Sequence, residues 1–327
     1  MRLGWILVAI IFFINLLLVF WWYKNEKIKV DSSIEFGQIE NISGQIYFGP
    51  TYDYEWFADY LEKSEKSIQV YLYSFMYEPL IEAFKQISQR WTKIQLLIEN
   101  DKFNHDDKDY YELLEHFDSY KNIHIKNDEK LWTNFMHAKT FLLDNKFIIQ
   151  TANLTYSAFF RSAEIFFVSD NKDILESLRY IFEQDREAKD IDKERIHPNL
   201  LICQINCRKG YKNFLANATD KIHIFSQNLS DDMFLEHLTN FPWELKIMLA
   251  DNESNYSNKE LFSNKEVQFL KEPYLHAKSI LIDKKYLIIW SSNFTTNSLD
   301  NNREVNIILT DPDIISEYKS MFTRYRE

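Results

Sequence analysis

The chain has 327 residues, of which 46% are hydrophobic and 27% charged, so it is a globular protein of about two domains rather than a disordered, collagen-like or disulfide-stapled chain. Its net charge of -11 disfavours a non-specific nucleic-acid coat protein, because an acidic surface repels phosphate backbones. With 5 glycines and neither a G-x-G-x-x-G nor a Walker pattern, glycine-rich nucleotide loops are excluded.

Residues 3–23 form the one long apolar run of the sequence. About 20 helical residues span the roughly 30 Å of a bilayer core, and Trp21, Trp22 and Tyr23 lie where an interfacial aromatic belt belongs. We therefore predict an uncleaved, single-pass N-terminal transmembrane anchor, with residues 1–28 as anchor and flank. A cleaved signal peptide is the alternative, although no small-residue cleavage site follows the run. Lysine and arginine counts leave the side of the membrane open.

The remaining sequence predicts an internal repeat. Residues 46–75 predict a loop, an amphipathic helix and an alternating strand, and residues 200–229 predict the same order. Each unit is followed by a second strand and then by a pair of strands around a turn. Nearly unbroken apolar runs in these strands suit sheets buried on both faces by helices. The charged stretch 183–198 predicts a helix that trails into a linker.

Two cysteines, Cys203 and Cys207, lie in a segment whose pattern predicts a strand. Four residues along a strand cover roughly 13 Å, which is too far for a disulfide. We therefore expect two ordinary buried thiols.

The strongest signal is a duplicated motif, H-x-K-x4-D. The first copy contains His137, Lys139 and Asp144, and the second contains His276, Lys278 and Asp283. Each copy is followed by an asparagine, and a glutamate comes eleven residues after that asparagine. These residues are Asn153 and Glu164 in the first copy, and Asn293 and Glu304 in the second. A single match is weak evidence, but matching offsets in two copies of a repeat exclude coincidence in practice.

These residue types suit phosphoryl chemistry at one shared site. In a strand, positions two apart point to the same face, so each histidine projects with its lysine. If the halves pack about a pseudo-two-fold axis, both pairs meet. One imidazole then attacks phosphorus while the other protonates the leaving oxygen. Lysines and asparagines hold phosphoryl oxygens, and each glutamate accepts the far N–H of an imidazole. Asp144 and Asp283 lie at the far strand ends, where turn or salt-bridge roles behind the site are expected.

On these motifs the sequence resembles the phospholipase D superfamily over nearly all of residues 40–327. The resemblance implies an α/β fold of two pseudo-two-fold-related halves, each a mixed β-sheet flanked by helices, here predicted at 29–190 and 191–327. It also implies that His137 is the nucleophile, that His276 is the general acid and base, and that no metal or other cofactor is needed. The phosphate-binding residues would be Lys139, Lys278, Asn153 and Asn293.

The sequence departs from the family pattern after each aspartate. The family places G-S-x-N there, whereas this chain has Gln150 and Trp290 at the glycine positions, with hydroxyls kept at Thr151 and Ser291. The first copy is also one residue shorter between its aspartate and Asn153. A missing glycine is expected to remove room beside the phosphate.

Three activities fit the motifs. We expect a membrane-anchored phosphodiesterase that hydrolyses phospholipid head groups. An anchored endonuclease and a cardiolipin synthase-like phosphatidyltransferase are the alternatives, and a scaffold without turnover is disfavoured by the intact motifs. The expected partners are phospholipid and membrane, with nucleic acid as alternative substrate. Trp132, Phe135 and Tyr274 precede the motifs and are candidates for lining the substrate mouth. The other six histidines show no metal-ligand spacing.

Overall fold

The computed structural model describes residues 38–50, 54–100 and 108–326. The predicted anchor at 3–23 lies outside the described residues. Within the described ranges, no helix is both long and apolar enough to cross a membrane.

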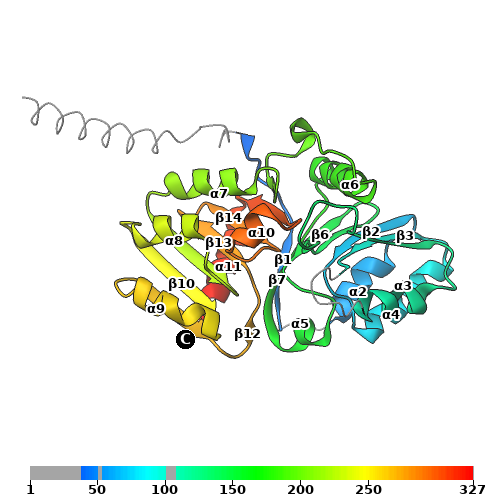
Figure 1. The fold of residues 1–327 in the computed structure, drawn as a ribbon, viewed down its shortest axis with the longest axis horizontal. Coiled ribbons are helices and arrows are strands. Elements are labelled where there is room, and N and C mark those ends of the chain that lie inside the picture. The colour runs from blue at the N-terminus through cyan, green and yellow to red at the C-terminus, as the bar shows by residue number, and fades with distance from the viewer. Residues whose placement is uncertain (1–37, 51–53, 101–107, 327) are drawn as a thin grey trace, which may run out of the picture. The chain divides into compact units, whose positions relative to one another are not determined.

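Each half is built around a β-sheet (Figure 1). Both sheets are mixed, and the strand order is the same in both. In the first half β2 pairs in parallel with β3 on one side and antiparallel with β5 on the other. The strands of the first sheet, in spatial order, are β1 (Gln45–Gly49), β7 (Ser162–Ser169), β6 (Phe147–Gln150), β5 (Thr140–Leu142), β2 (Ser67–Leu72), β3 (Lys93–Ile98) and β4 (Ile123–Asn127).

The second sheet repeats this order strand for strand. Its strands are β8 (Leu200–Ile202), β15 (Val305–Leu309), β14 (Tyr286–Trp290), β13 (Ser279–Ile282), β9 (Lys221–Ser226), β10 (Glu244–Ala250) and β11 (Glu266–Leu270). The short strand β12 (Tyr274–Leu275) belongs to the second half in sequence but pairs in parallel with β7 of the first half. The predicted mixed α/β fold with two repeated halves is therefore confirmed.

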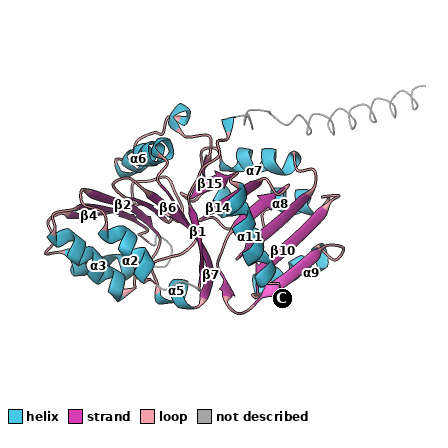
Figure 2. Ribbon diagram, turned by 180° about the vertical axis from the view of Figure 1, so that it is seen from behind, coloured by secondary structure: helices cyan, strands magenta, loops and turns pink. Residues whose placement is uncertain are grey.

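Helices cover both faces of each sheet (Figure 2). In the first half α2, α3 and α4 pack on one face, while α6 packs on the other. The first-half helices are α2 (Glu55–Glu62), α3 (Glu78–Gln89), α4 (Lys108–Phe117), α5 (Tyr156–Phe160) and α6 (Lys172–Arg186). Their second-half counterparts are α7 (Cys207–Ala216), α8 (Asp232–Thr239), α9 (Tyr256–Leu261), α10 (Thr296–Asp300) and α11 (Pro312–Arg324).

One hydrophobic core runs through both halves. It includes Ile165 and Leu178 of the first half together with Leu281, Val305 and Tyr318 of the second, all fully buried. Burial of each large apolar side chain contributes about 1.5–3 kcal/mol. The halves are thus held together by the same force that folds each of them.

The expectation for the cysteines was wrong, because the strand ends earlier than predicted. β8 stops at Ile202, a tight turn follows with Gln204 at a φ of 70°, and Cys207 opens α7. The turn brings the two Cα atoms to 4.7 Å, and Cys203 and Cys207 form a disulfide. An extended strand would have kept them apart, but the chain reverses direction between them.

The motif aspartates stabilise the turns that lead into β2 and β9. Asp144 accepts backbone N–H groups of Glu65, Lys66 and Ser67 at 2.7–3.2 Å. Burial raises the pKa of Asp144, but these hydrogen bonds outweigh it, so the pKa lies below its usual value. Neither this residue nor its counterpart makes a described hydrogen bond to a motif histidine, which fits the expected turn role rather than a place beside the imidazoles.

Asp283 does the same for Thr219, Asp220 and Lys221 at 2.8–3.2 Å. Its pKa is also lowered, because backbone donors outweigh the effect of burial. Since a folded-state pKa below the unfolded value stabilises the charged form, this stabilisation is present above the unfolded pKa and is lost as the pH falls through the folded one.

We predict that Asp144→Asn and Asp283→Asn each lower the free energy of unfolding at pH 7 by about 1.5–3 kcal/mol, since each weakens several hydrogen bonds to a charged group. Urea unfolding at pH 7 and at pH 3 measures this, and the difference from the parent protein should shrink at the lower pH. Asp170→Asn is the matched control, because Asp170 makes only an exposed pair with Lys146 and should change stability by less than about 0.5 kcal/mol. Equal effects of all three substitutions would contradict the turn role.

Candidate active site

The segment before each motif histidine crosses to the opposite half. Met136 forms a parallel bridge with Arg303, and the N–H of His137 donates to the carbonyl of Arg303 at 3.0 Å. In the same way β12 pairs with β7, and the N–H of His276 donates to the carbonyl of Ala163 at 3.1 Å. Arg303 and Ala163 each directly precede a motif glutamate. The backbone therefore places each histidine beside the glutamate of the other half.

The side chains complete these crossed pairs. His137 Nδ1 lies 2.9 Å from Glu304 Oε1 and 3.1 Å from Oε2. His276 Nδ1 lies 2.7 Å from Glu164 Oε1. Both carboxylates are buried, and burial raises their pKa values, but the neighbouring histidines and lysines outweigh that effect and lower them. Each ionised glutamate therefore accepts Nδ1–H, which leaves the Nε2 lone pair of each imidazole for other chemistry.

A hydroxyl fixes each glutamate from behind. Thr151 Oγ1 donates to Glu164 Oε2 and accepts the N–H of Ile165 at 2.9 Å. Ser291 Oγ donates to Glu304 Oε2 at 2.5 Å and accepts the N–H of Val305 at 3.3 Å. These are the two hydroxyls kept at the family's serine position. The sequence showed that they were present but not that they orient the carboxylates.

Both motif lysines are fully buried beside the imidazoles. Lys139 Nζ donates to the carbonyl of His137 at 2.7 Å, and Lys278 Nζ donates to the carbonyl of His276 at 2.8 Å. Burial lowers the pKa of Lys139 to about 8 and that of Lys278 to about 7, while Glu164 and Glu304 act in the opposite direction on both. Lys139 is therefore mainly a cation at pH 7, whereas Lys278 titrates near that pH, and the two carboxylates favour the charged form of both.

The electrostatics join the two half-sites into one cluster. The pKa of His137 is lowered to about 4, because burial together with Lys139 and Lys278 outweighs the opposing effect of Glu304. Burial also lowers the pKa of His276, with Lys278 and Lys139 acting in the same direction and Glu164 against it. Each histidine therefore experiences the lysine of the other half, and both imidazoles are neutral at neutral pH.

The two asparagines occupy equivalent positions at this cluster. The carboxamide oxygens of Asn153 and Asn293 are buried and have no hydrogen-bond partner among the described residues. Such groups are costly unless a ligand satisfies them. Asn153 also lines a cavity of about 270 Å³ together with Glu164 and His276.

The shorter spacer in the first copy does not displace Asn153. The extra residue of the second copy is taken up in the hairpin turn, because Thr140 pairs with Ile149 whereas Ser279 pairs with Ile289. Beyond the turn the copies match again. Gln150 N–H donates to the carbonyl of Lys139 at 3.1 Å, and Trp290 N–H donates to that of Lys278 at 3.2 Å.

The expected loss of room at the two glycine positions does not follow from the observed packing. Trp290 is fully buried against Tyr211 and Phe294, with ring centroids 4.5 and 4.2 Å away. Its neighbour Ser291 contacts Glu304 instead, as the alternation of a strand requires. Gln150 is buried too, and its Nε2 donates to the carbonyl of Ala152 at 2.8 Å. Both replacements pack behind the strand, away from the imidazoles.

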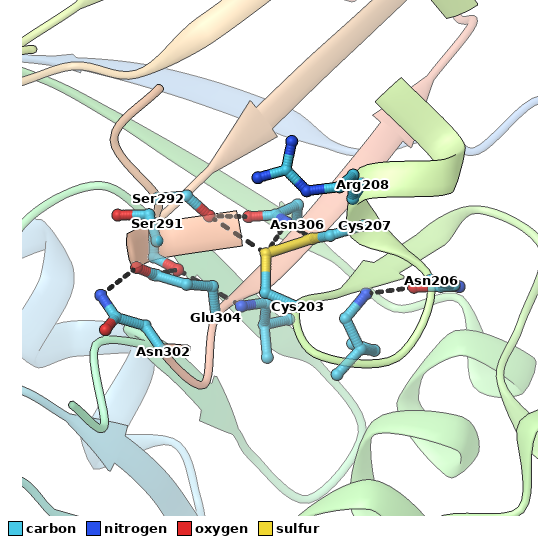
Figure 3. The surroundings of a disulfide bond; sticks show 12 residues. Cys203, Asn206, Cys207, Arg208, Ser291, Ser292, Asn302, Glu304 and Asn306 are labelled. Carbon is cyan, nitrogen blue, oxygen red and sulfur yellow. Dashed lines mark hydrogen bonds between the residues drawn. A yellow bond between two sulfur atoms is a disulfide. The ribbon is translucent and has the colours of Figure 1, made fainter. Parts of the chain in front are cut away.

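The disulfide lies against Glu304 and the start of β15, which begins at the next residue (Figure 3). The N–H of Cys203 donates to the carbonyl of Glu304 at 3.1 Å, and Asn306 Nδ2 lies 2.9 Å from Cys207 Sγ. Cys203 Sγ also lies 3.5 Å from the hydroxyl of Ser292. The sequence prediction missed these contacts, because it placed both cysteines in one strand.

Tyr73 also lies at the site, although the motifs gave no sign of it. Its ring makes an edge contact with the imidazole of His137 at 4.9 Å, and Lys139 Nζ lies 5.3 Å from the ring centroid. A cation over an aromatic face is stabilised when desolvated. The equivalent position in the second half is Gln227, whose Nε2 donates to the hydroxyl of Tyr274 at 3.1 Å. The two half-sites therefore differ in their immediate surroundings.

The three aromatic residues expected to line the substrate mouth lie in different places in the structure. Tyr274 lines the cavity beside His276, and Phe135 packs against Tyr73 with centroids 6.1 Å apart. Trp132 is 99% exposed and lines another cavity with Arg303 and Asp185. Within the described part of the chain, no group of three or more histidine, cysteine, aspartate or glutamate residues is arranged to hold a metal ion.

We predict that nitrogen-15 imidazole NMR shows both histidines as neutral Nδ1–H tautomers at pH 7, with His137 protonating near pH 4. Glu304→Gln removes a charge that raises the pKa of His137, so it should lower that pKa further and leave His276 nearly unchanged. Glu164→Gln should do the reverse. Single histidine variants assign the resonances. A shift of His276 rather than His137 in Glu304→Gln would contradict the crossed pairing.

Comparisons with known proteins agree with this architecture. A family model described as "Cardiolipin synthase, PLD-like domain" matches residues 57–186 and 211–326, one segment in each half. A segment of 54 residues is 39% identical to mitochondrial cardiolipin hydrolase of Mus musculus, covering 16% of this chain and 24% of that protein. The match thus spans about a quarter of that relative.

Two solved structures share the fold. Phosphatidylserine synthase of Haemophilus influenzae Rd KW20 superimposes with a TM-score of 0.65 at 12% identity, covering 86% of each chain. Polyphosphate kinase of Porphyromonas gingivalis superimposes with a TM-score of 0.68 at 16% identity, covering 87% of this chain and 50% of that one. At these identities the likeness concerns the fold alone. The family model, however, covers more than half of the chain and both copies of the motif, and on this ground the chain belongs to the phospholipase D superfamily.

Proposed function

We propose that the protein is a phosphodiesterase that cleaves phospholipid head groups at one site shared by its two halves, through a phosphohistidine intermediate. The observation that carries this proposal is the pair of crossed His–Glu contacts, flanked by two buried lysines. Each imidazole has its Nδ1–H held by a carboxylate and its Nε2 available. That is the arrangement a nucleophile and a general acid both need.

In the proposed first step, Nε2 of His137 forms a bond to phosphorus while the bond from phosphorus to the leaving oxygen breaks. The leaving oxygen takes a proton from Nε2 of His276. Both imidazoles are neutral at neutral pH before substrate binds, so His276 must gain this proton when the anionic diester arrives. A nearby negative charge raises a histidine pKa, and the diester supplies that charge.

In the second step, water gives a proton to His276 and its oxygen attacks phosphorus, which breaks the P–N bond and restores neutral His137. An alcohol in place of water yields a transfer product by the same path. Lys139, Lys278 and the amides of Asn153 and Asn293 stabilise the charge on the phosphoryl oxygens. The assignment of the nucleophile to the first copy follows the family resemblance.

Three features favour lipid over nucleic acid as substrate. The net charge is -11, so any attraction for a phosphate backbone must come from the local lysines. Exposed aromatic side chains Tyr156, Phe160 and Tyr274 lie on or beside the cavity at His276, where an apolar substrate surface can contact them. The relative that matches a 54-residue segment is by name a cardiolipin hydrolase. We also propose that residues 1–28 anchor the site beside its bilayer substrate.

The test is to offer the purified full chain labelled phosphatidylcholine, cardiolipin and single-stranded DNA, with a chelator and with or without glycerol as acceptor. We expect head-group release from lipid. His137→Ala and His276→Ala should each lower kcat/KM by at least about 100-fold, because each removes a nucleophile or a general acid. His116→Ala is the control, since His116 is part-exposed on α4 and should leave activity unchanged.

Cleavage of DNA alone would overturn the lipid proposal and favour the endonuclease. A glycerol adduct as the main product would favour the phosphatidyltransferase. Full activity in either histidine variant would overturn the shared site itself.

A further inference from the structure

The two half-sites are related by the repeat. Where equivalent positions differ, they are expected to contact two different parts of the substrate. The cavity beside His276 is lined by residues of β7, α5 and β12, which meet at one end of β7 (Figure 1). Its polar lining includes Thr155, Ser157, Ser162 and Arg161. Arg161 contributes a positive charge to the cavity lining.

Arg161 lines the cavity and is exposed to solvent. Its guanidinium lies 5.3 Å from the ring centroid of Tyr156, and its backbone anchors both α5 and Tyr274, whose N–H donates to the Arg161 carbonyl at 3.1 Å. Among the described residues, no carboxylate lies within ion-pair distance of this guanidinium. Glu164, which also lines the cavity, is fully buried and engaged by His276 and Thr151.

The equivalent position beside His137 carries no charge. Counting from each motif asparagine, Arg161 corresponds to Asn301, and Phe160 and Tyr156 correspond to Asp300 and Thr296. Asp300 and Thr296 are not open to a ligand in the same way. Arg208 pairs with Asp300 at 2.6 Å, and Thr296 donates to Asp231 at 2.8 Å. One side of the shared site thus presents Arg161 without an ion-pair partner among the described residues, and the other presents Asn301 beside a guanidinium and carboxylates that are paired with one another.

We infer that the cavity beside His276 binds a second negatively charged group, carried by the alcohol component of the phosphodiester, and that Arg161 selects for it. This inference rests on the proposed function, in which His276 protonates the leaving alcohol and so lies next to it. The ligand class is an alcohol bearing a carboxylate or a phosphate. The hydroxyls of Ser157, Ser162 and Thr155 add hydrogen-bond donors, and the ring of Tyr274 covers the apolar part of the alcohol.

Short-chain phospholipids below their micellar concentration test this without an effect of surface charge. The two anionic arms are phosphatidylserine, with a carboxylate, and phosphatidylglycerol phosphate, with a phosphate monoester, and phosphatidylcholine is the reference. The full chain should prefer at least one anionic head group by kcat/KM. Arg161→Gln should reduce that preference by roughly 10-fold, the lower end of the range for a hydrogen bond to a charged group, because Arg161 is exposed. Arg161→Lys should keep part of it.

The control is Lys319→Gln at an exposed position of α11, which removes one surface charge and should leave the preference unchanged. If Arg161→Gln and Arg161→Lys both lowered kcat/KM by the same factor on all three lipids, the role of Arg161 would be merely structural. That result would overturn the inference. So would a wild-type protein that cleaves all three lipids equally. Failure of the proposed function is distinct, since then none of the lipids is cleaved at all. The arm whose preference falls further identifies the carboxylate or the phosphate as the ligand.

Discussion

The crossed contact between each motif histidine and the glutamate of the opposite half is the interaction on which the site depends. It fixes the tautomer of both imidazoles. Backbone pairing accompanies it, between β12 and β7 and between Met136 and Arg303. Neither half contains a complete pair of its own. The duplicated fold therefore yields one site from two incomplete ones, and the core that spans both halves keeps them in register.

Buried lysines and buried glutamates face each other in the site before substrate binds, and both imidazoles are neutral near pH 7. Burying charged groups is costly, and the crossed pairing offsets that cost by giving each carboxylate an imidazole, a hydroxyl and a nearby lysine. In the proposed reaction the diester adds a negative charge, which favours the protonated form of the neighbouring imidazole and of Lys278. Substrate binding and charging of the general acid are thereby coupled. The acidic surface of the whole chain does not oppose this, because the two lysines act locally.

Much of the fold and of the site was predictable from the sequence, and each wrong or missed prediction has a physical cause. The repeat, the mixed sheets and the choice of Glu164 and Glu304 followed from spacing, since equal offsets in two copies require equivalent places in two sheets. The crossing of the pairs was not predictable, because offsets within one copy carry no information on which half supplies the partner. The disulfide was missed because periodicity does not show that β8 ends at Ile202. Tyr73 and Arg161 lie outside the motif, and only the folded chain places them beside His137 and His276.

The central claim is that both histidines act on one phosphate. Its most direct test is a crystal structure of the protein with vanadate, which adopts the geometry of a phosphoryl group under attack. We predict a single vanadate within roughly 3 Å of Nε2 of both His137 and His276, with Lys139 and Lys278 on its oxygens. Two separate vanadate ions, or one that contacts a single histidine, would contradict it.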